Sequence, residues 1–235
     1  MSTPNIHDIR PRVVFERLEA AFPNQDMKFS VHIPTSQIGG MTLLESAVLV
    51  SLARLSKAKE IFEFGTYMGA TSVLLAANSP DDAHVTTLDI DASGFEAEEK
   101  RDENLRDATD NDNFLRRQHK AVGAVYVDRA EPDVRRKISR IFHDSRRLDV
   151  TQFMGRFDQI FIDGGHDWDT IKSDTEKALL MAKKDAIIVW HDYRSKIHLD
   201  VTRYVDFFSA NRRIVHVQDT MLAILPTGRF EGLLG

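Results

Sequence analysis

Residues 62–72 read FEFGTYMGATS, and this stretch decides the fold. An apolar run stops at Gly65, and Gly69 then opens GATSVLLAANS, a run with helical periodicity. A buried strand, a glycine turn and a helix in this order are typical of an open α/β sheet, whose ligands bind beyond the carboxyl ends of the strands. Gly65 allows a sharp turn, Gly69 lets a ligand approach the backbone, and the start of the helix offers free N–H groups to an anion.

The spacing of these glycines narrows the choice of ligand. It is Gly-x-x-x-Gly, whereas dinucleotide-binding turns have Gly-x-Gly-x-x-Gly, so a pyrophosphate is disfavoured. Glu63, just before the turn, would repel a phosphate and attract a cationic group. A ligand that carries both a carboxylate and a cation, such as S-adenosylmethionine, therefore fits better. A glycine turn without a ligand is the alternative.

Short apolar segments alternate with helical segments around this stretch. Strands are predicted at 61–65, 84–91, 140–144, 157–163 and 185–192, helices at 42–56, 69–79, 167–183 and 197–210, and a terminal antiparallel hairpin at 213–226. This alternation predicts an α/β fold, a three-layer α/β/α sandwich around a mostly parallel seven-stranded sheet that ends in an antiparallel strand.

The chain divides into two parts in this interpretation. Residues 1–40 are predicted to form an N-terminal segment, helical and near the substrate side, and 41–235 a single domain. A charged insertion at about 93–137 separates the second and third strands, where one crossover helix would suffice. It is either a solvated helix with a surface loop, or a segment that covers the substrate or mediates dimerisation, because long loops in compact domains are often functional.

Composition excludes several classes of function. The 235 residues include 36 acidic and 31 basic side chains and no cysteine. The net charge of -5 gives no general attraction to nucleic acid, and the lack of cysteine excludes disulfides, thiolate metal sites and cysteine nucleophiles. Neither a signal peptide nor a membrane-spanning run is visible, so we expect a soluble cytoplasmic protein without a membrane partner.

Acidic residues follow two of the predicted strands. Asp89 ends the strand at 84–91, about twenty residues after the glycine turn, where an acid is placed to bind ribose hydroxyls. A plain surface strand end is the alternative. Asp144 and Ser145 follow the strand at 140–144 and are predicted to meet the edge of an adenine.

The segments IFIDGGHDW (160–168) and IIVWHDY (187–193) are the most informative. Asp163 and His191 are 28 positions apart, the length of one strand–helix–strand unit, so their strands should be adjacent. Asp163, His191 and Asp192 are then a candidate three-ligand set for a divalent cation.

Such an ion would bind and acidify a substrate hydroxyl, and His166 could remove its proton. Alternatively, Asp163 caps the next helix and His191-Asp192 is an ordinary strand end. The remaining histidines lack such neighbours in sequence and are interpreted as structural or solvent-facing: His7, His32, His119, His198 and His216.

Through these motifs the sequence resembles the class I S-adenosylmethionine-dependent methyltransferases, in particular the branch of catechol and macrocin O-methyltransferases. The resemblance covers about 40–226 without the insertion and implies a Rossmann-like fold. TLDID (87–91), HDS (143–145) and IFIDGGHDWDTIKSD (160–174) match its strand ends. The residues that fall in its first cofactor motif are Glu63, Gly65, Thr66, Tyr67, Gly69 and Thr71.

The resemblance also implies roles. In the macrolide branch the aspartate of the IDGGH-like motif binds magnesium and the histidine acts as base, which here are Asp163 and His166. Catechol-like enzymes have Asp-Asn after the fifth strand and macrolide enzymes Glu-Asp, whereas this chain has His191-Asp192. Imidazole is a poor magnesium ligand and a good one for manganese, iron or zinc, so the metal stays open between magnesium and manganese.

The resemblance thus implies an O-methyltransferase that uses S-adenosylmethionine, is assisted by a divalent metal and acts on a hydroxyl of a small molecule. The acceptor would be a sugar, a catechol or a secondary metabolite, and a homodimer is expected. Two alternatives remain open. One is a metal-independent enzyme of the same fold that methylates an amine or a macromolecule, and the other is a non-catalytic cofactor-binding relative. Cephalosporin hydroxylase-like proteins resemble this branch as well.

Overall fold

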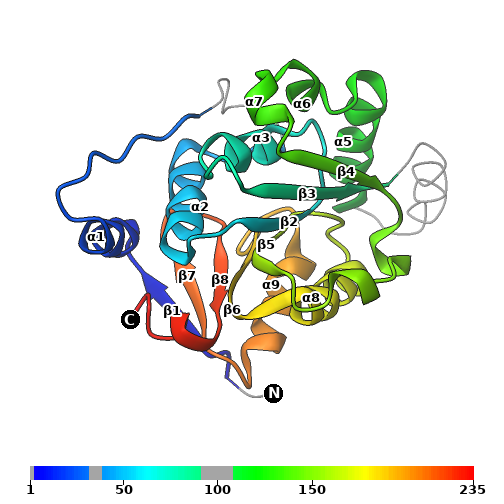
Figure 1. Ribbon diagram of the computed structural model, residues 1–235. Helices are drawn as coiled ribbons and strands as arrows, with labels where there is room; N and C mark the ends of the chain where they lie inside the picture. The colour runs from blue at the N-terminus through cyan, green and yellow to red at the C-terminus, as the bar shows by residue number, and fades with distance from the viewer. Residues whose placement is uncertain (1–2, 32–38, 91–107) are drawn as a thin grey trace.

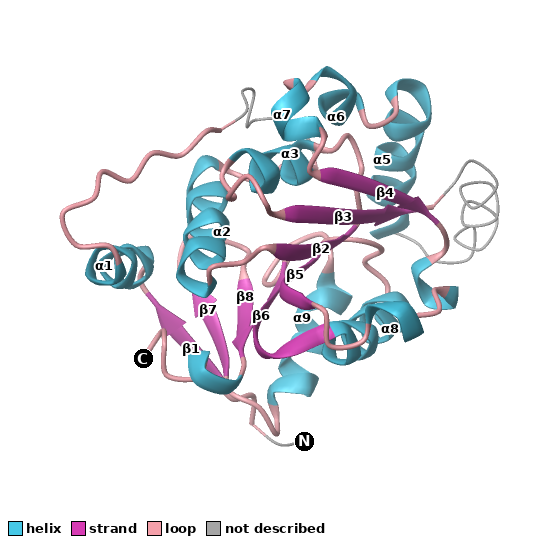
Figure 2. Cartoon of the chain, viewed as in Figure 1, coloured by secondary structure: helices cyan, strands magenta, loops and turns pink. Residues whose placement is uncertain are grey.

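One mixed sheet forms the centre of the molecule. The computed structural model describes residues 3–31, 39–90 and 108–235, and in these residues eight strands are ordered β1-β7-β8-β6-β5-β2-β3-β4. Helices α1, α2 and α3 lie on one face and α8 and α9 on the other (Figures 1 and 2). Only β8 runs antiparallel to its neighbours, β6 and β7. The predicted fold class is therefore confirmed.

The elements have the following bounds. The strands are β1 Ile6–Ile9, β2 Glu60–Phe64, β3 His84–Asp89, β4 Ile138–Phe142, β5 Phe157–Ile162, β6 Ala182–Trp190, β7 Ile214–Val217 and β8 Ala223–Pro226. The longer helices are α1 Pro11–Ala21, α2 Leu43–Ser56, α3 Ala70–Ala77, α5 Ala108–Val122, α8 Trp168–Met181 and α9 Leu199–Ser209. Within the described residues, no helix combines the length and apolar character that crossing a membrane requires.

The sheet has one strand more than the sequence predicts. β1 pairs in parallel with β7 at the edge of the sheet, with Ile6 opposite Ile214. The N-terminal segment, expected to be helical, therefore contributes a strand before its helix α1, and α1 packs on α2. The strand is only four residues long and carries His7 and Asp8 at its centre, so no apolar run indicates it.

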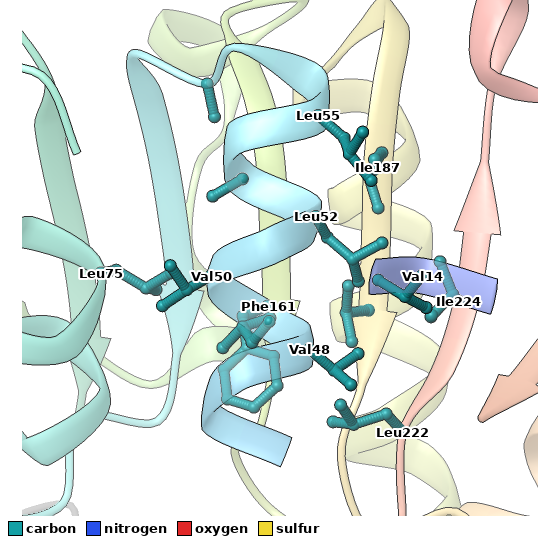
Figure 3. Close-up of a cluster of buried hydrophobic side chains, with 14 of the residues drawn as sticks. Val14, Val48, Val50, Leu52, Leu55, Leu75, Phe161, Ile187, Leu222 and Ile224 are labelled. Carbon is teal, nitrogen blue, oxygen red and sulfur yellow. The ribbon is translucent and has the colours of Figure 1, made fainter. Parts of the chain in front are cut away.

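Helix α2 carries much of the core on one face of the sheet. It begins with a capping box, in which Thr42 and Glu45 satisfy each other's backbone N–H groups. Two of its buried side chains illustrate this packing: Leu55 lies beside Ile187, and Val48 lies close to Leu222 (Figure 3). Burying a side chain of this size stabilises the fold by about 1.5–3 kcal/mol, so this face anchors α2 firmly against β5 and β6.

The glycine turn after β2 is fixed by close backbone packing. Gly65 has φ +91°, and a Cβ there would lie 2.0 Å from the carbonyl oxygen of Asp163. Gly69 has φ +82° at the N-cap of α3, and a Cβ there would meet Val127 Cγ2 at 2.4 Å. Both positions require glycine, and together they bring the start of α3 close to the ends of β2 and β5.

The described part of the predicted insertion is helical. Its first residues, up to 107, lie outside the described residues, and α5 is followed by the short helices α6 Val125–Arg129 and α7 Pro132–Arg135. Two apolar residues of this segment, Ala124 and Val127, pack against Val73 of α3. The insertion is thus joined to the main core by its own small hydrophobic cluster.

Candidate active site

A cavity of about 620 Å³ lies beyond the carboxyl ends of the central strands. Loops that follow β2, β3, β4, β5 and β6 contribute to its wall, and α5 contributes from the insertion. This is the edge at which an open α/β sheet binds ligands. Most residues of the predicted site line it: Gly65, Thr66, Tyr67, Thr71, Asp89, Asp144, Ser145, Asp163, His166, His191 and Asp192.

Glu63 and Gly69 are not among these lining residues. Glu63 is buried on β2 and accepts a hydrogen bond from Ser72 Oγ. Burial raises the pKa of Glu63 to about 8, and the charges of Asp163 and Asp89 add to this shift. A carboxyl group that is neutral at pH 7 does not attract a cation as an anion would, so the structure places Glu63 beneath the turn as a support.

Asp89 ends β3 at the rim of the cavity. Its Oδ2 accepts the backbone N–H of Tyr67 at 2.7 Å, and its Oδ1 accepts the N–H of Ile90 at 2.8 Å. Tyr67 has a positive φ of +47°, so Asp89 holds an otherwise unfavourable turn in place.

Asp144 follows β4 and is already engaged within the protein. Its Oδ1 accepts from the backbone N and from Nε of Arg146, at 2.9 and 3.0 Å, and its Oδ2 accepts from Nη2 at 3.0 Å. Arg147 lies 3.7 Å from the same carboxylate. Asp144 therefore shapes the turn that carries Ser145 into the cavity wall.

The predicted metal ligands come together at the ends of two adjacent strands. His191 Nδ1 lies 3.0 Å from Asp163 Oδ1 and 3.3 Å from Asp192 Oδ2. Two neighbouring ligands of a six-coordinate ion with bonds of about 2.1 Å are about 3 Å apart, so these three atoms suit a divalent cation. Asp192 has φ +59°, a strained conformation of a kind that clusters at functional sites.

Glu45 supports this cluster from α2. Its Oε2 accepts from Thr42, while its Oε1 accepts the backbone N–H of Met221 at 2.7 Å and lies 3.7 Å from His191 Nε2. Burial alone would raise the pKa of Glu45, but His191 and these N–H groups outweigh it and lower the pKa to about 2. At this distance Glu45 acts on His191 through its negative charge and not through a hydrogen bond.

His166 is held from both ring nitrogens. Nδ1 lies 2.8 Å from Asp112 Oδ1, and Nε2 lies 3.1 Å from Asp192 Oδ2. Burial would lower the pKa of His166, but the two carboxylates outweigh it and raise the pKa well above its usual value. Asp112 belongs to α5, so the insertion supplies a direct partner of the predicted base.

His198 corrects an expectation from the sequence. It is not an isolated histidine, because its ring stacks on that of His166 with 3.7 Å between centroids, and its Nε2 lies 3.2 Å from Asn111 Nδ2. His198 is buried and lines the cavity. Sequence reasoning missed Glu45, Asp112 and His198, because nothing in their local sequence sets them apart from a helix cap, a charged segment and a loop.

The described residues contain two groups of three side chains that could each hold a metal: Asp163, His191 and Asp192, and Asp112, His166 and His198. The rings of His166 and His198 are within 21° of parallel. Imidazole lone pairs lie in the ring plane, so two stacked rings do not converge on one ion about 2 Å away. The geometry therefore favours the first group.

A family model described as "Methyltransferase domain" matches residues 62–193, more than half of the chain. The chain belongs to this family of methyltransferase domains. The match includes the glycine turn, the candidate metal ligands and His166. The resemblance to class I methyltransferases that depend on S-adenosylmethionine is thereby confirmed.

Solved structures with the same fold include three O-methyltransferases. A Staphylococcus aureus protein, provisionally assigned as a caffeoyl-CoA O-methyltransferase, is 18% identical over 93% of this methyltransferase and 92% of that chain, with a TM-score of 0.54. A provisionally assigned O-methyltransferase from Klebsiella pneumoniae is 17% identical over 92% and 88%, with a TM-score of 0.51. An O-methyltransferase from Bacillus cereus in complex with SAH (S-adenosylhomocysteine) is 16% identical over 93% and 89%, with a TM-score of 0.50. Such identities show the fold alone. The comparison with curated proteins gave no match.

Proposed function

We propose that this methyltransferase transfers the methyl group of S-adenosylmethionine to a hydroxyl group of a small molecule, and that a divalent metal ion holds the acceptor. The observation that carries the proposal is the cluster of Asp163, His191 and Asp192, whose ligand atoms are spaced for one ion. The cluster lines the same cavity as the glycine turn, so metal and cofactor would lie side by side.

The cofactor would occupy the part of the cavity next to the glycine turn. The start of α3 offers backbone N–H groups to the carboxylate of the cofactor, and Asp89 offers acceptor atoms to the ribose hydroxyls. The Bacillus cereus O-methyltransferase, which shares the fold, was solved in complex with SAH. This placement supports the predicted roles of Gly65, Thr66, Tyr67 and Thr71, which line this part of the cavity.

Asp163, Asp192 and Nδ1 of His191 would hold the ion. When bound, it would supply Lewis acidity that lowers the pKa of an acceptor hydroxyl. A nitrogen ligand beside two carboxylates favours manganese over magnesium, since magnesium prefers oxygen ligands throughout. Glu45, 3.7 Å from Nε2, would act on the ring of His191 through its negative charge.

His166 would take the proton of the acceptor at Nε2. Asp112 accepts the proton on Nδ1, which leaves Nε2 as the atom that faces Asp192 and the cavity. Asp192 is one of the two charges that keep a proton on His166, so a cation shared with Asp192 would weaken that hold. The ring of His198, stacked on His166, fixes its plane.

The size of the site favours a small acceptor. Small-molecule sites have volumes of roughly 300–1,000 Å³, and the cavity of about 620 Å³ must hold the cofactor as well. Residues of α5 and of the loop before α9, among them Leu115 and Ile197, also line the cavity. These features support a sugar, a catechol or a comparable secondary metabolite, and they do not support a macromolecular acceptor.

Calorimetric titration tests the proposal. S-adenosylmethionine should bind to the wild type and to Asp163→Ala, whereas manganese or magnesium should bind to the wild type only, because the variant lacks one of three ligands. In a screen of hydroxyl acceptors, His166→Ala should lose turnover and keep cofactor affinity. Full turnover in a strong chelator, or methylation of amines by Asp163→Ala, would instead establish a metal-independent enzyme.

A further inference from the structure

One buried carboxylate in the cavity wall has no partner. Asp174, on α8, is 0% exposed, and within the described residues neither of its oxygens finds a hydrogen-bond partner. It lines the cavity together with Ser145 and Gly164. Leaving a buried polar group unpaired costs about 1–3 kcal/mol, and more for a charged group, so native proteins rarely do so without a reason.

The charged groups around Asp174 do not explain why its carboxyl group is left unpaired. Burial raises the pKa of Asp174 to about 7, and the charges of Asp167 and Asp144 act in the same direction. Ser145 and Lys177 oppose the shift, but Lys177 Nζ donates to the carbonyl oxygen of Arg146 at 3.0 Å and lies 2.6 Å from Ser173 Oγ. The carboxyl group therefore keeps its capacity to accept a hydrogen bond from something in the cavity.

A glycine, Gly164, lies next to Asp174 in the cavity wall. A Cβ on Gly164 would lie 3.3 Å from Asp174 Oδ2, a tight contact that would crowd the carboxylate. Gly164 also lines the cavity, directly after the candidate metal ligand Asp163. Because position 164 carries no side chain, the Asp174 carboxylate lies against bare backbone at this point of the cavity wall.

Asp144, predicted to meet the adenine edge, is poorly suited to accept a hydrogen bond from it. Both of its oxygens are already held by Arg146, at 2.9–3.0 Å, and Arg147 lies near them. An amino group of a ligand would have to compete with these charge-assisted hydrogen bonds, which are among the stronger ones in proteins. Within the described residues Asp174, in the same wall, makes no charge-assisted hydrogen bond, although the Ser145 side chain and the charge of Lys177 both favour its ionised form.

We propose that Asp174 recognises the base of the cofactor by accepting a hydrogen bond from the exocyclic amino group of adenine. Adenine offers two hydrogens on this group, and among the described residues the buried carboxylate of Asp174 has acceptor atoms without a protein hydrogen bond. Asp174 would thereby distinguish adenine from a purine without the amino group. The proposal requires that the cofactor binds in this cavity, and it is independent of the metal and of the methyl acceptor.

The test measures the affinity of SAH and of its analogue in which hydrogen replaces the adenine amino group. Wild type should bind SAH at least about tenfold more tightly than the analogue, the ratio expected for one hydrogen bond to a charged group. In Asp174→Leu the two ligands should bind with nearly equal affinity. Asp174→Asn, whose amide oxygen still accepts, should keep part of the ratio, and Asp144→Asn should keep it in full.

Thermal unfolding of the ligand-free proteins separates recognition from a structural role. Replacing an unpaired buried carboxylate with leucine should leave the melting temperature unchanged or raise it, while SAH binding weakens. An unchanged ligand ratio in Asp174→Leu, or a ratio that collapses in Asp144→Asn, overturns the proposal. A lower melting temperature with equal losses for both ligands would assign Asp174 to the fold instead. Failure of SAH to bind even the wild type would contradict the proposal that the cofactor binds in this cavity.

Discussion

At the residue scale, the candidate base depends on a partner that lies 54 positions away in the chain. Asp112 accepts the proton on Nδ1 of His166 and so decides which nitrogen is free to take a proton from the acceptor. Orienting partners of this kind affect activity by about 10–100-fold in metal enzymes. Asp112 does not touch the reacting atoms in this scheme, and it acts by positioning His166.

Asp112→Asn should therefore lower kcat by about 10–100-fold and leave the affinity for S-adenosylmethionine unchanged. Steady-state kinetics with a hydroxyl acceptor, combined with cofactor titration, measures both quantities. Asp133→Asn is the matched control, because Asp133 is an exposed residue of α7 and should keep wild-type turnover. Equal kcat in the two variants would remove Asp112 from the mechanism.

Glu63 gives a second prediction at this scale, from its pKa of about 8. A carboxyl group with a raised pKa is protonated in the folded protein and ionised in the unfolded chain between about pH 4.5 and 8. Its contribution to stability is complete at low pH and decreases as the pH rises through this window, by about 1.4 kcal/mol per pH unit. Between pH 5 and 8, wild type should thus lose unfolding free energy relative to Glu63→Gln, which denaturant titration measures. Parallel curves would contradict the raised pKa.

At the scale of elements, the glycine turn joins three parts of the sheet edge. Its first glycine packs against the end of β5, and its second packs against α6 from the insertion. The turn therefore connects the cofactor site with the candidate metal site and the insertion. Its packing depends on backbone atoms more than on side chains.

Gly65→Ala should destabilise the protein by several kcal/mol, because its Cβ would lie 2.0 Å from the carbonyl oxygen of Asp163. This oxygen is a backbone atom, so it cannot move away as a flexible side chain could. Gly155→Ala is a matched control with φ +61° and nothing within 4 Å of the added Cβ. It bears only the backbone penalty of about 1–2 kcal/mol. Thermal unfolding should rank Gly65→Ala well below Gly155→Ala, and equal melting temperatures would refute the packing argument.

At the scale of the whole molecule, the cavity collects residues from most of the chain. Its lining residues come from segments that are far apart in the sequence, among them Gly39, Thr66, Asp112, Asp163 and His198. Two groups of potential metal ligands meet there, joined by the contact between His166 and Asp192.

Manganese should bind with a stoichiometry of one ion per chain, because the stacked rings of His166 and His198 cannot both direct lone pairs at a second ion. His191→Ala should abolish binding, whereas His198→Ala should retain one ion. Calorimetric stoichiometry and elemental analysis of dialysed protein measure this. Two ions in the wild type, with one lost in His198→Ala, would assign a second metal site to Asp112, His166 and His198.

The site residues at the strand ends were predictable, because their position follows from the order and direction of the strands. Asp89, Asp163 and His191 each follow a short apolar run, and parallel strands bring their carboxyl ends to one edge whatever the loops do. The glycine turn was predictable for the same reason. Its glycines follow an apolar run in the sequence, and the fold fixes its position at the end of a strand.

The partners of these residues were not predictable. Asn111 and Asp112 lie in a charged helix whose sequence resembles a solvated surface, and only the path of α5 across the cavity brings them to His198 and His166. β1 is too short to produce a pattern, and it gains its stability from pairing with β7. Contacts between distant segments depend on how helices pack, and no local periodicity encodes that.

Glu45 occupies an unusual position in this respect. One of its oxygens starts helix α2 through the capping box with Thr42, and the other faces His191 in the candidate metal cluster. Selection therefore acts on this position in two ways, through the yield of folded protein and through turnover. A glutamine there could still cap the helix but would remove the charge beside His191, so variants selected for thermal robustness alone could lose activity without any visible defect in folding.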